Sequence, residues 1–208
     1  MDPLGFARSL VLALALLLAA GPAPADERVI AALGDSLTAG LGVAAEEAYP
    51  ALLERRLRQA GFPYRVVNAG VSGDTSAGGL RRLDWVLRSR PEIVIVALGA
   101  NDGLRGVPVA ALRDNLTAIV ARLQASGVRV LLVGMRLPPN YGAAYADDFA
   151  RTFHDVARRT STAFLPFLLE GVGGDPALNQ ADGIHPNAAG QRAVAEQIWP
   201  SLEPLLRR

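Results

Sequence analysis

The segment VIAALGDSLTAG, residues 29–40, decides how the rest of the chain is interpreted. Its first five residues are apolar throughout, which is typical of a strand that is buried on both faces. The strand then meets Gly34-Asp35-Ser36, and these residue types dominate turns for ordinary backbone reasons. A plain turn explains the triplet, but it also leaves a serine hydroxyl at the end of an interior strand. The remainder of the sequence decides between a turn and a functional serine.

Four more short apolar runs alternate with segments of helical periodicity. The runs predict strands at residues 64–69, 92–98, 128–135 and 163–167. The amphipathic segments predict helices at residues 49–61, 78–89, 108–127, 145–160 and 187–206. Strands without polar alternation suit a parallel sheet covered by helices. The sequence therefore predicts an α/β fold, a three-layer α/β/α sandwich, as one domain over residues 26–208. In such a sheet the ligand site lies outside the carboxyl ends of the strands.

The first 25 residues predict an export signal rather than a part of the fold. Residues 10–20 are apolar, and Ala23-Pro24-Ala25 fits the small-x-small pattern that precedes a signal-peptidase site. A membrane span needs roughly 20 apolar residues, so an uncleaved anchor is the less favoured alternative. We therefore expect a signal peptide over residues 1–25, cleavage near Ala25, and a periplasmic or secreted product without stable membrane insertion.

The composition excludes several kinds of chemistry. The chain has no cysteine, and all 21 basic side chains are arginine. Cysteine nucleophiles, thiolate metal sites, lysine Schiff bases and the P-loop lysine are therefore excluded. The net charge of +1 gives no basic footprint for nucleic acid, so we expect no nucleic-acid partner. Two histidines, His154 and His185, remain for acid–base chemistry.

Ser36 has candidate partners in the loop that follows the last predicted strand. Asp182 and His185 lie three residues apart there. This separation lets the carboxylate bond one ring nitrogen while the other nitrogen faces the serine hydroxyl. The alternative is a turn followed by a helix cap at Asn187. This alternative explains Asp182 but leaves His185 unexplained. His154 lies inside an amphipathic helix, where a structural role is expected.

Two further positions at the strand ends are candidates for stabilising a negatively charged intermediate. The side-chain amide of Asn101 follows the third predicted strand, and the backbone N–H of Gly70 follows the second. Such donors form the oxyanion hole of acyl-transfer enzymes, although Asn-Asp-Gly is also an ordinary turn sequence. Asp35, Asp74 and Asp102 are expected to have structural roles.

Four blocks, in this order along the chain, resemble the SGNH (GDSL-type) hydrolases: GDSL at 34–37, Gly70, GAND at 99–102 and DGIHP at 182–186. The longer strings SGDTS, NDGLRG and RLPPNYG (72–76, 101–106 and 136–142) are similar to the bacterial periplasmic thioesterase I/lysophospholipase/arylesterase group. The resemblance implies a flavodoxin-like, five-stranded parallel sheet with the order 2-1-3-4-5.

The resemblance also implies roles for individual residues. Ser36 is then the nucleophile, His185 the base and Asp182 the carboxylate that orients it. The oxyanion hole is then formed by the Ser36 N–H, the Gly70 N–H and the Asn101 side chain. Ala100 departs from the family pattern, which often has glycine at this position, and its methyl group leaves the chain-length preference open.

Together these features predict a serine hydrolase of carboxylic esters and thioesters, such as aryl esters, acyl-CoA or lysophospholipids. We expect a monomer that acts on a small-molecule substrate without a cofactor or metal. Apolar residues near the strand ends, among them Leu104 and Leu137, favour acyl substrates over sugars. One alternative is a carbohydrate deacetylase of the same superfamily, and another is a non-catalytic binding domain. A metal-dependent hydrolase using Asp35, Asp182 and His185 is less favoured, because one histidine without cysteine makes a poor transition-metal site.

Overall fold

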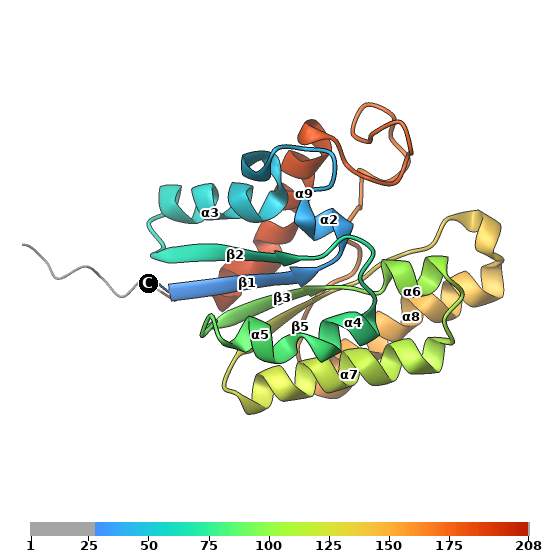
Figure 1. Ribbon diagram of the computed structural model, residues 1–208, viewed down its shortest axis with the longest axis horizontal. Helices are drawn as coiled ribbons and strands as arrows, with labels where there is room; N and C mark the ends of the chain where they lie inside the picture. The colour runs from blue at the N-terminus through green and yellow to red at the C-terminus, as the bar shows by residue number, and fades with distance from the viewer. Residues whose placement is uncertain (1–27, 208) are drawn as a thin grey trace, which may run out of the picture.

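The computed structural model describes residues 28–207 and contains a parallel sheet covered by helices on both faces (Figure 1). Its five strands have the order β2-β1-β3-β4-β5, which confirms the order implied by the family resemblance. They span Arg28–Gly34 (β1), Tyr64–Gly70 (β2), Ile93–Ala97 (β3), Arg129–Val133 (β4) and Ala163–Leu165 (β5). The predicted signal peptide and its cleavage site lie outside the described residues.

The helices form the two outer layers of the predicted sandwich. One face of the sheet, the upper one in Figure 1, is covered by α3 (Tyr49–Gln59) and α9 (Ala188–Leu202). The opposite face is covered by α4 (Ser76–Arg81), α5 (Leu83–Leu87), α7 (Val109–Ala125) and α8 (Ala143–Thr160). The short helices α2 (Ser36–Ala39) and α6 (Ala100–Leu104) follow the carboxyl ends of β1 and β3. Short 3-10 turns span Ala45–Glu47, Pro139–Tyr141 and Glu203–Leu205.

Some predicted elements have different boundaries in the structure. The predicted helix 78–89 is two helices, because the chain bends at Arg82, which ends α4 and precedes α5. The predicted strand 163–167 ends at Leu165, since Pro166 has no backbone N–H with which to continue the ladder. The sequence does not predict α2 and α6, because each is too short to show helical periodicity.

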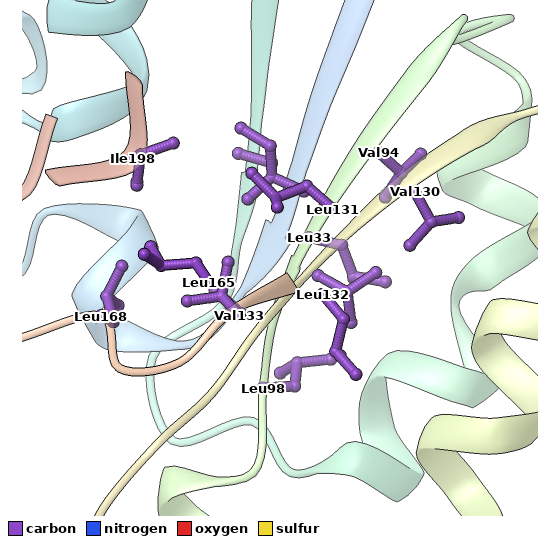
Figure 2. Packing of buried hydrophobic residues seen from close by; sticks show 14 of the residues in the cluster. Leu33, Val94, Leu98, Val130, Leu131, Leu132, Val133, Leu165, Leu168 and Ile198 are labelled. Carbon is purple, nitrogen blue, oxygen red and sulfur yellow. The ribbon is translucent and has the colours of Figure 1, made fainter. Parts of the chain in front are cut away.

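Burial on both faces explains the apolar strand sequences. Every residue of β3 is buried, and so is β1 from residue 29 to 34. Figure 2 shows Val94 of β3 and Leu131 of β4 within the same apolar cluster as Leu165 of β5 and Ile198 of α9. Fully burying one such side chain contributes roughly 1.5–3 kcal/mol. The central strands thus form a well-packed platform for the loops at their carboxyl ends.

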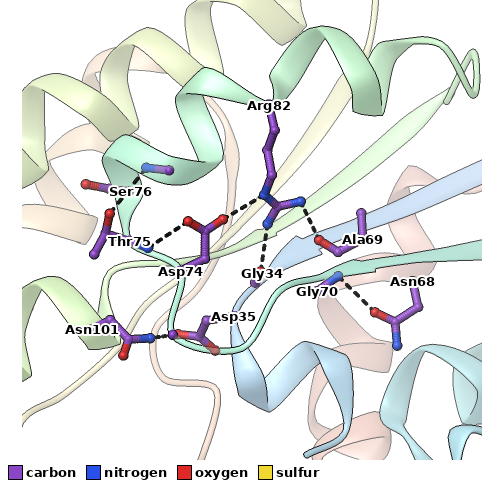
Figure 3. Close-up of polar contacts among 12 residues, drawn as sticks. Gly34, Asp35, Asn68, Ala69, Gly70, Asp74, Thr75, Ser76, Arg82 and Asn101 are labelled. Carbon is purple, nitrogen blue, oxygen red and sulfur yellow. Dashed lines mark hydrogen bonds and ion pairs between the residues drawn. The ribbon is translucent and has the colours of Figure 1, made fainter.

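One arginine ties the ends of β1 and β2 together at this edge of the sheet (Figure 3). Arg82 donates from Nη1 to the Ala69 carbonyl at 2.6 Å and from Nη2 to the Gly34 carbonyl at 2.8 Å. Its Nε donates to Asp74 Oδ2 at 2.6 Å, so Asp74 has a structural partner, as expected from the sequence. Only 19% of the Arg82 side chain is exposed. The guanidinium therefore fixes the strand ends from which the candidate site residues project.

We predict that Arg82→Ala lowers the free energy of unfolding by about 2–4 kcal/mol, because two carbonyls and a carboxylate lose their donor. Arg81→Ala is the matched control, since Arg81 is exposed on α4 and carries the same charge. Urea unfolding followed by circular dichroism measures both variants. Equal effects of the two substitutions would contradict this role of Arg82.

Candidate active site

Ser36 begins α2 directly after the end of β1. Asp35 caps this helix, because its Oδ1 accepts a hydrogen bond from the Leu37 N–H at 3.0 Å. The turn requires glycine at position 34, since a Cβ on Gly34 would lie 1.9 Å from Thr38 Oγ1. The serine is thus placed at the carboxyl edge of the sheet with 9% of its surface exposed.

A series of hydrogen bonds joins Ser36 to two residues of the last loop. His185 Nε2 lies 2.9 Å from Ser36 Oγ, and His185 Nδ1 lies 2.7 Å from Asp182 Oδ2. Because an ionised carboxylate only accepts hydrogen bonds, Nδ1 carries the proton in the neutral imidazole. Nε2 is then free to accept the proton of the serine hydroxyl. The structure brings all three sequence-predicted residues together in this order.

Asp182 is kept ionised by its own loop. Its Oδ1 accepts from the backbone N–H groups of His185 and Ile184, both at 2.9 Å. These two bonds, followed by the bond to the His185 ring, lower the pKa of Asp182 from 3.8 to about 2. The side chain is 45% exposed, so the low pKa comes from hydrogen bonds rather than from a buried ion pair.

The loop that carries His185 is anchored beside the turn at residues 34–41 that carries Ser36. Gln180 Nε2 donates to the Leu41 carbonyl at 2.7 Å, and the Gln180 N–H donates to the His185 carbonyl at 2.8 Å. Asn187 caps α9 by accepting from the Ala189 N–H at 2.9 Å, which confirms the cap expected at this position. The turn and the cap of the alternative interpretation therefore coexist with the Ser36–His185 contact.

Helix α9 is also joined to the segment around Ser36. The buried side chain of Gln191 accepts from the Tyr49 N–H at 2.9 Å and donates to the Leu37 carbonyl at 3.4 Å. Leu37 is the neighbour of Ser36 in sequence. This bridge therefore holds the start of α9, and with it the His185 loop, against the turn that carries Ser36.

The predicted oxyanion donor Asn101 lies on α6, close to the same turn. Its Nδ2 donates to Asp35 Oδ2 at 3.2 Å (Figure 3). Asp35 is 1% exposed. Burial raises its pKa from 3.8 to about 6, although the hydrogen bonds from Leu37 and Asn101 act in the opposite direction. The expected turn-stabilising role of Asp35 is confirmed by the helix cap, and the contact with Asn101 comes in addition to it.

The prediction of Gly70 as an oxyanion donor is corrected by its surroundings. The Gly70 N–H donates to Asn68 Oδ1 at 2.9 Å, so this donor is already occupied (Figure 3). A Cβ on Gly70 would lie 2.2 Å from the backbone nitrogen of Ala39. Glycine is therefore required at this position because α2 packs against the end of β2.

The loop after β2 contains a second glycine, Gly73, which is not among the donors predicted from the sequence. Gly73 has a φ of 79°, a conformation that favours glycine. Its carbonyl accepts from Arg105 Nη2 at 2.9 Å, and its N–H has no acceptor among residues 28–207. The string SGDTS at 72–76 contains this glycine, but the residue order alone does not distinguish it from Gly70.

Asp102 and His154 have the structural surroundings expected from the sequence. Asp102 is buried and accepts from the backbone N–H and the Oγ of Ser76 at 2.8 and 2.5 Å. His154 is exposed on α8, with its ring centroid 6.0 Å from that of Phe164. Neither side chain takes part in the Ser36–His185–Asp182 series.

The metal-dependent alternative requires Asp35, Asp182 and His185 as common ligands. The Asp35 carboxylate is instead bonded to Leu37 and Asn101. Within the part of the chain that the structure describes, no three His, Cys, Asp or Glu side chains are grouped so that they can hold a metal ion. The arrangement of side chains thus offers this alternative no ligand set.

An apolar cavity of about 410 Å³ opens beside these residues. Its lining includes Leu37, Ala100 and Ile184, the sequence neighbours of Ser36, Asn101 and His185. Leu104 and Leu137, which the sequence associates with acyl substrates, also line it. Its size and its apolar lining are typical of a small-molecule site.

A serine, a histidine and a carboxylate that are hydrogen-bonded in series at the edge of an α/β sheet define a serine hydrolase. Residues 32–193 match the model of the GDSL-like Lipase/Acylhydrolase family, and the chain belongs to this family. It is therefore an ester hydrolase, which confirms the reaction class predicted from the sequence.

Similar proteins agree with this assignment. Esterase TesA from Pseudomonas aeruginosa is 46% identical over 200 residues, which are 96% of this chain and 100% of the relative. Thioesterase 1/protease 1/lysophospholipase L1 from Escherichia coli K12 is 40% identical over 185 residues, 88% of this chain and 86% of the relative. A crystal structure of TesA is similar with a TM-score of 0.84 at 48% identity, covering 86% of this chain and 100% of that one.

Proposed function

We propose that this chain hydrolyses carboxylic esters and thioesters through an acyl-enzyme on Ser36. The observation that carries the proposal is the hydrogen-bonded series of Ser36, His185 and Asp182 beside an apolar cavity that their sequence neighbours Leu37, Gly183 and Ile184 line. The names of the two relatives, an esterase and a thioesterase/lysophospholipase, support both kinds of bond as substrates.

Acylation begins when His185 Nε2 takes the proton of Ser36 as Oγ attacks the carbonyl carbon of the substrate. The imidazolium that forms faces the ionised Asp182 carboxylate, which stabilises it across the 2.7 Å contact. His185 then gives the proton to the departing alcohol or thiol as the C–O or C–S bond breaks. A water molecule then attacks the acyl-enzyme as His185 takes its proton. His185 gives this proton to Ser36 Oγ as the acyl C–O bond breaks, which releases the acid and restores the serine hydroxyl.

Three N–H groups serve as oxyanion donors in this proposal. The Ser36 N–H lies in the first turn of α2, where backbone amides lack an acceptor within the helix. Asn101 supplies its Nδ2, and Gly73 supplies the backbone N–H first assigned to Gly70. Such donors act on charge that develops in the transition state, and losing one costs on the order of 10²–10³ in kcat.

The cavity favours an acyl chain of several carbons over a sugar. Its wall includes the aliphatic side chains of Leu37, Leu104 and Leu137 and the ring of Phe167. Each methylene group that a substrate buries there contributes about 0.8 kcal/mol, whereas sugar hydroxyls find few partners. We therefore propose that the substrates are aryl esters, alkyl esters and thioesters of medium or long acyl chains, and not acetylated carbohydrates.

A larger side chain in the wall of this cavity tests the proposed acyl preference. Leu104→Trp should fill part of it and shift the preference toward short acyl chains. The kcat/KM for p-nitrophenyl octanoate should fall at least about tenfold relative to p-nitrophenyl acetate, as expected for a few lost apolar contacts. Leu104→Ala, which enlarges the cavity, should leave the preference for the longer ester in place. An unchanged chain-length profile in both variants would place the acyl chain elsewhere.

Substitutions at Ser36, His185 and Asp182 test the proposed catalytic series. Ser36→Ala and His185→Ala should each lower kcat by on the order of 10⁴–10⁶, and the double variant should lose little more, because the two residues act as a unit. Asp182→Asn should cost less than Ser36→Ala. His154→Ala is the control, since it removes the exposed histidine on α8 and should leave kcat unchanged.

An organophosphonate inhibitor provides an independent readout of the nucleophile. Mass spectrometry should find the phosphonate on Ser36 in the parent protein and none in Ser36→Ala. Additive losses in the double variant, or labelling at another residue, would show that Ser36 and His185 do not form one catalytic unit.

We also propose that residues 1–25 direct export of the protein. The apolar run 10–20 and the Ala23-Pro24-Ala25 pattern support cleavage after Ala25. Within residues 28–207, no helix combines the length and the apolar character needed to cross a membrane. Intact-mass analysis of a periplasmic fraction should find Asp26 as the first residue. A protein in that fraction with Met1 retained would contradict the proposal.

A further inference from the structure

Asp35 is a buried carboxylate that the proposed reaction does not use. It is 1% exposed and lies at the N-cap of α2, immediately before Ser36. Its two oxygens have different partners: Oδ1 accepts from the Leu37 N–H at 3.0 Å, and Oδ2 accepts from Asn101 Nδ2 at 3.2 Å. Both partners are donors, so the side chain at position 35 must accept hydrogen bonds on both sides.

The helix cap alone does not explain a charge at this position. A cap needs one acceptor, and serine or asparagine serves about as well as aspartate. Burying a carboxylate is costly, and burial raises the pKa of Asp35 to about 6. Of the other titratable groups that face it, the His185 imidazole lowers the pKa of Asp35. Tyr49 stays neutral, because burial and then the Asp35 charge raise its pKa.

The contact with Asn101 explains why a charged side chain is favoured at position 35. A side-chain amide has a donor end and an acceptor end of nearly the same shape, and a half-turn about its last side-chain bond exchanges the end that faces Asp35. An ionised carboxylate only accepts, so it selects the nitrogen end. One N–H of Nδ2 then points at Asp35 and the second remains for another acceptor. If the Asn101 amide were rotated by a half-turn, Oδ1 would take the place of Nδ2 and would repel an oxyanion.

We propose that Asp35 is a positioning residue of the oxyanion hole, whose carboxylate holds the Asn101 amide with its nitrogen toward the reacting carbonyl. This inference rests on the proposed role of Asn101 as an oxyanion donor. Asp35 acts on the amide as Asp182 acts on His185: each carboxylate selects one of two possible arrangements of the donor beside it. The helix cap and the orientation of the amide thus depend on the two oxygens of one side chain.

Asp35→Asn tests this inference with almost no change of shape. The Leu37 N–H still requires an oxygen, so the new NH₂ group faces Asn101 Nδ2 and two donors meet. The amide at 101 must then turn or lose its partner. We expect kcat to fall on the order of 10²-fold, as for the loss of one oxyanion donor, with KM near that of the parent protein. Asp35→Ser, which keeps the cap and only removes the partner of Asn101, should lose less.

A double-mutant cycle separates positioning from a general structural role. Asn101→Ala should lower kcat by itself, and adding Asp35→Asn to it should cost no further activity, because no amide remains to be oriented. The melting temperature of Asp35→Asn should not fall, since the cap is kept and a buried charge is removed. If Asp35→Asn does not fold, Asp35→Ser takes its place in the cycle.

Full kcat in folded Asp35→Asn would overturn the inference, and so would losses that multiply in the double variant. Full kcat in Asn101→Ala would overturn it as well, by removing the donor that Asp35 is said to orient. These outcomes are distinguishable from failure of the proposed function, which would appear as turnover or phosphonate labelling that survives Ser36→Ala.

Discussion

The contact of helix α2 with the ends of β1 and β2 is possible only because two side chains are absent. A Cβ on Gly34 would lie 1.9 Å from Thr38 Oγ1, and a Cβ on Gly70 would lie 2.2 Å from the nitrogen of Ala39. With glycine at both places, α2 closes directly onto the strands, and Ser36 is fixed two residues beyond β1. Arg82 then satisfies carbonyl groups at both strand ends from the other side. The cap, the amide on α6 and the His185 loop are all arranged around this fixed turn.

Two carboxylates near the nucleophile occupy opposite environments. The Asp182 side chain is 45% exposed and has a pKa of about 2, because backbone N–H groups and the His185 ring bond the charged form. Asp35 is 1% exposed and has a pKa of about 6, because burial outweighs its hydrogen bonds. As the pH falls through about 6, Asp35 takes up a proton while Asp182 remains ionised. Asp182, the exposed carboxylate, therefore stays ionised to a lower pH than the buried Asp35.

The α/β architecture and the Ser36–His185–Asp182 series could be predicted from the sequence, because the apolar strands and His185 allow few other interpretations. Uniformly apolar strands require cover on both faces, and His185 has no purpose in a turn. The backbone amide after β2 that we propose as an oxyanion donor could not be predicted in this way. The Gly70 N–H already donates to the Asn68 side chain, and the orientation of the Gly73 N–H depends on the φ of that residue. The order of residues shows neither feature. The sequence does not show the contacts of Arg82 at the break between α4 and α5 either, because its guanidinium bonds the carbonyls of Gly34 and Ala69, which are far away along the chain.

The hydrogen bond between Ser36 and His185 joins residues 149 positions apart, and the bridge from Gln191 to Leu37 joins the same two regions. The sheet holds the serine, whereas a loop after the last strand holds its base. Proteins open locally at energies well below that of global unfolding. Opening of the loop from Gln180 to Asn187, with α9 still packed on the sheet, would separate His185 from Ser36 and leave the five strands paired. Activity therefore depends on the docking of this loop in addition to the stability of the fold, and we expect it to be lost by opening of the loop before the strands separate.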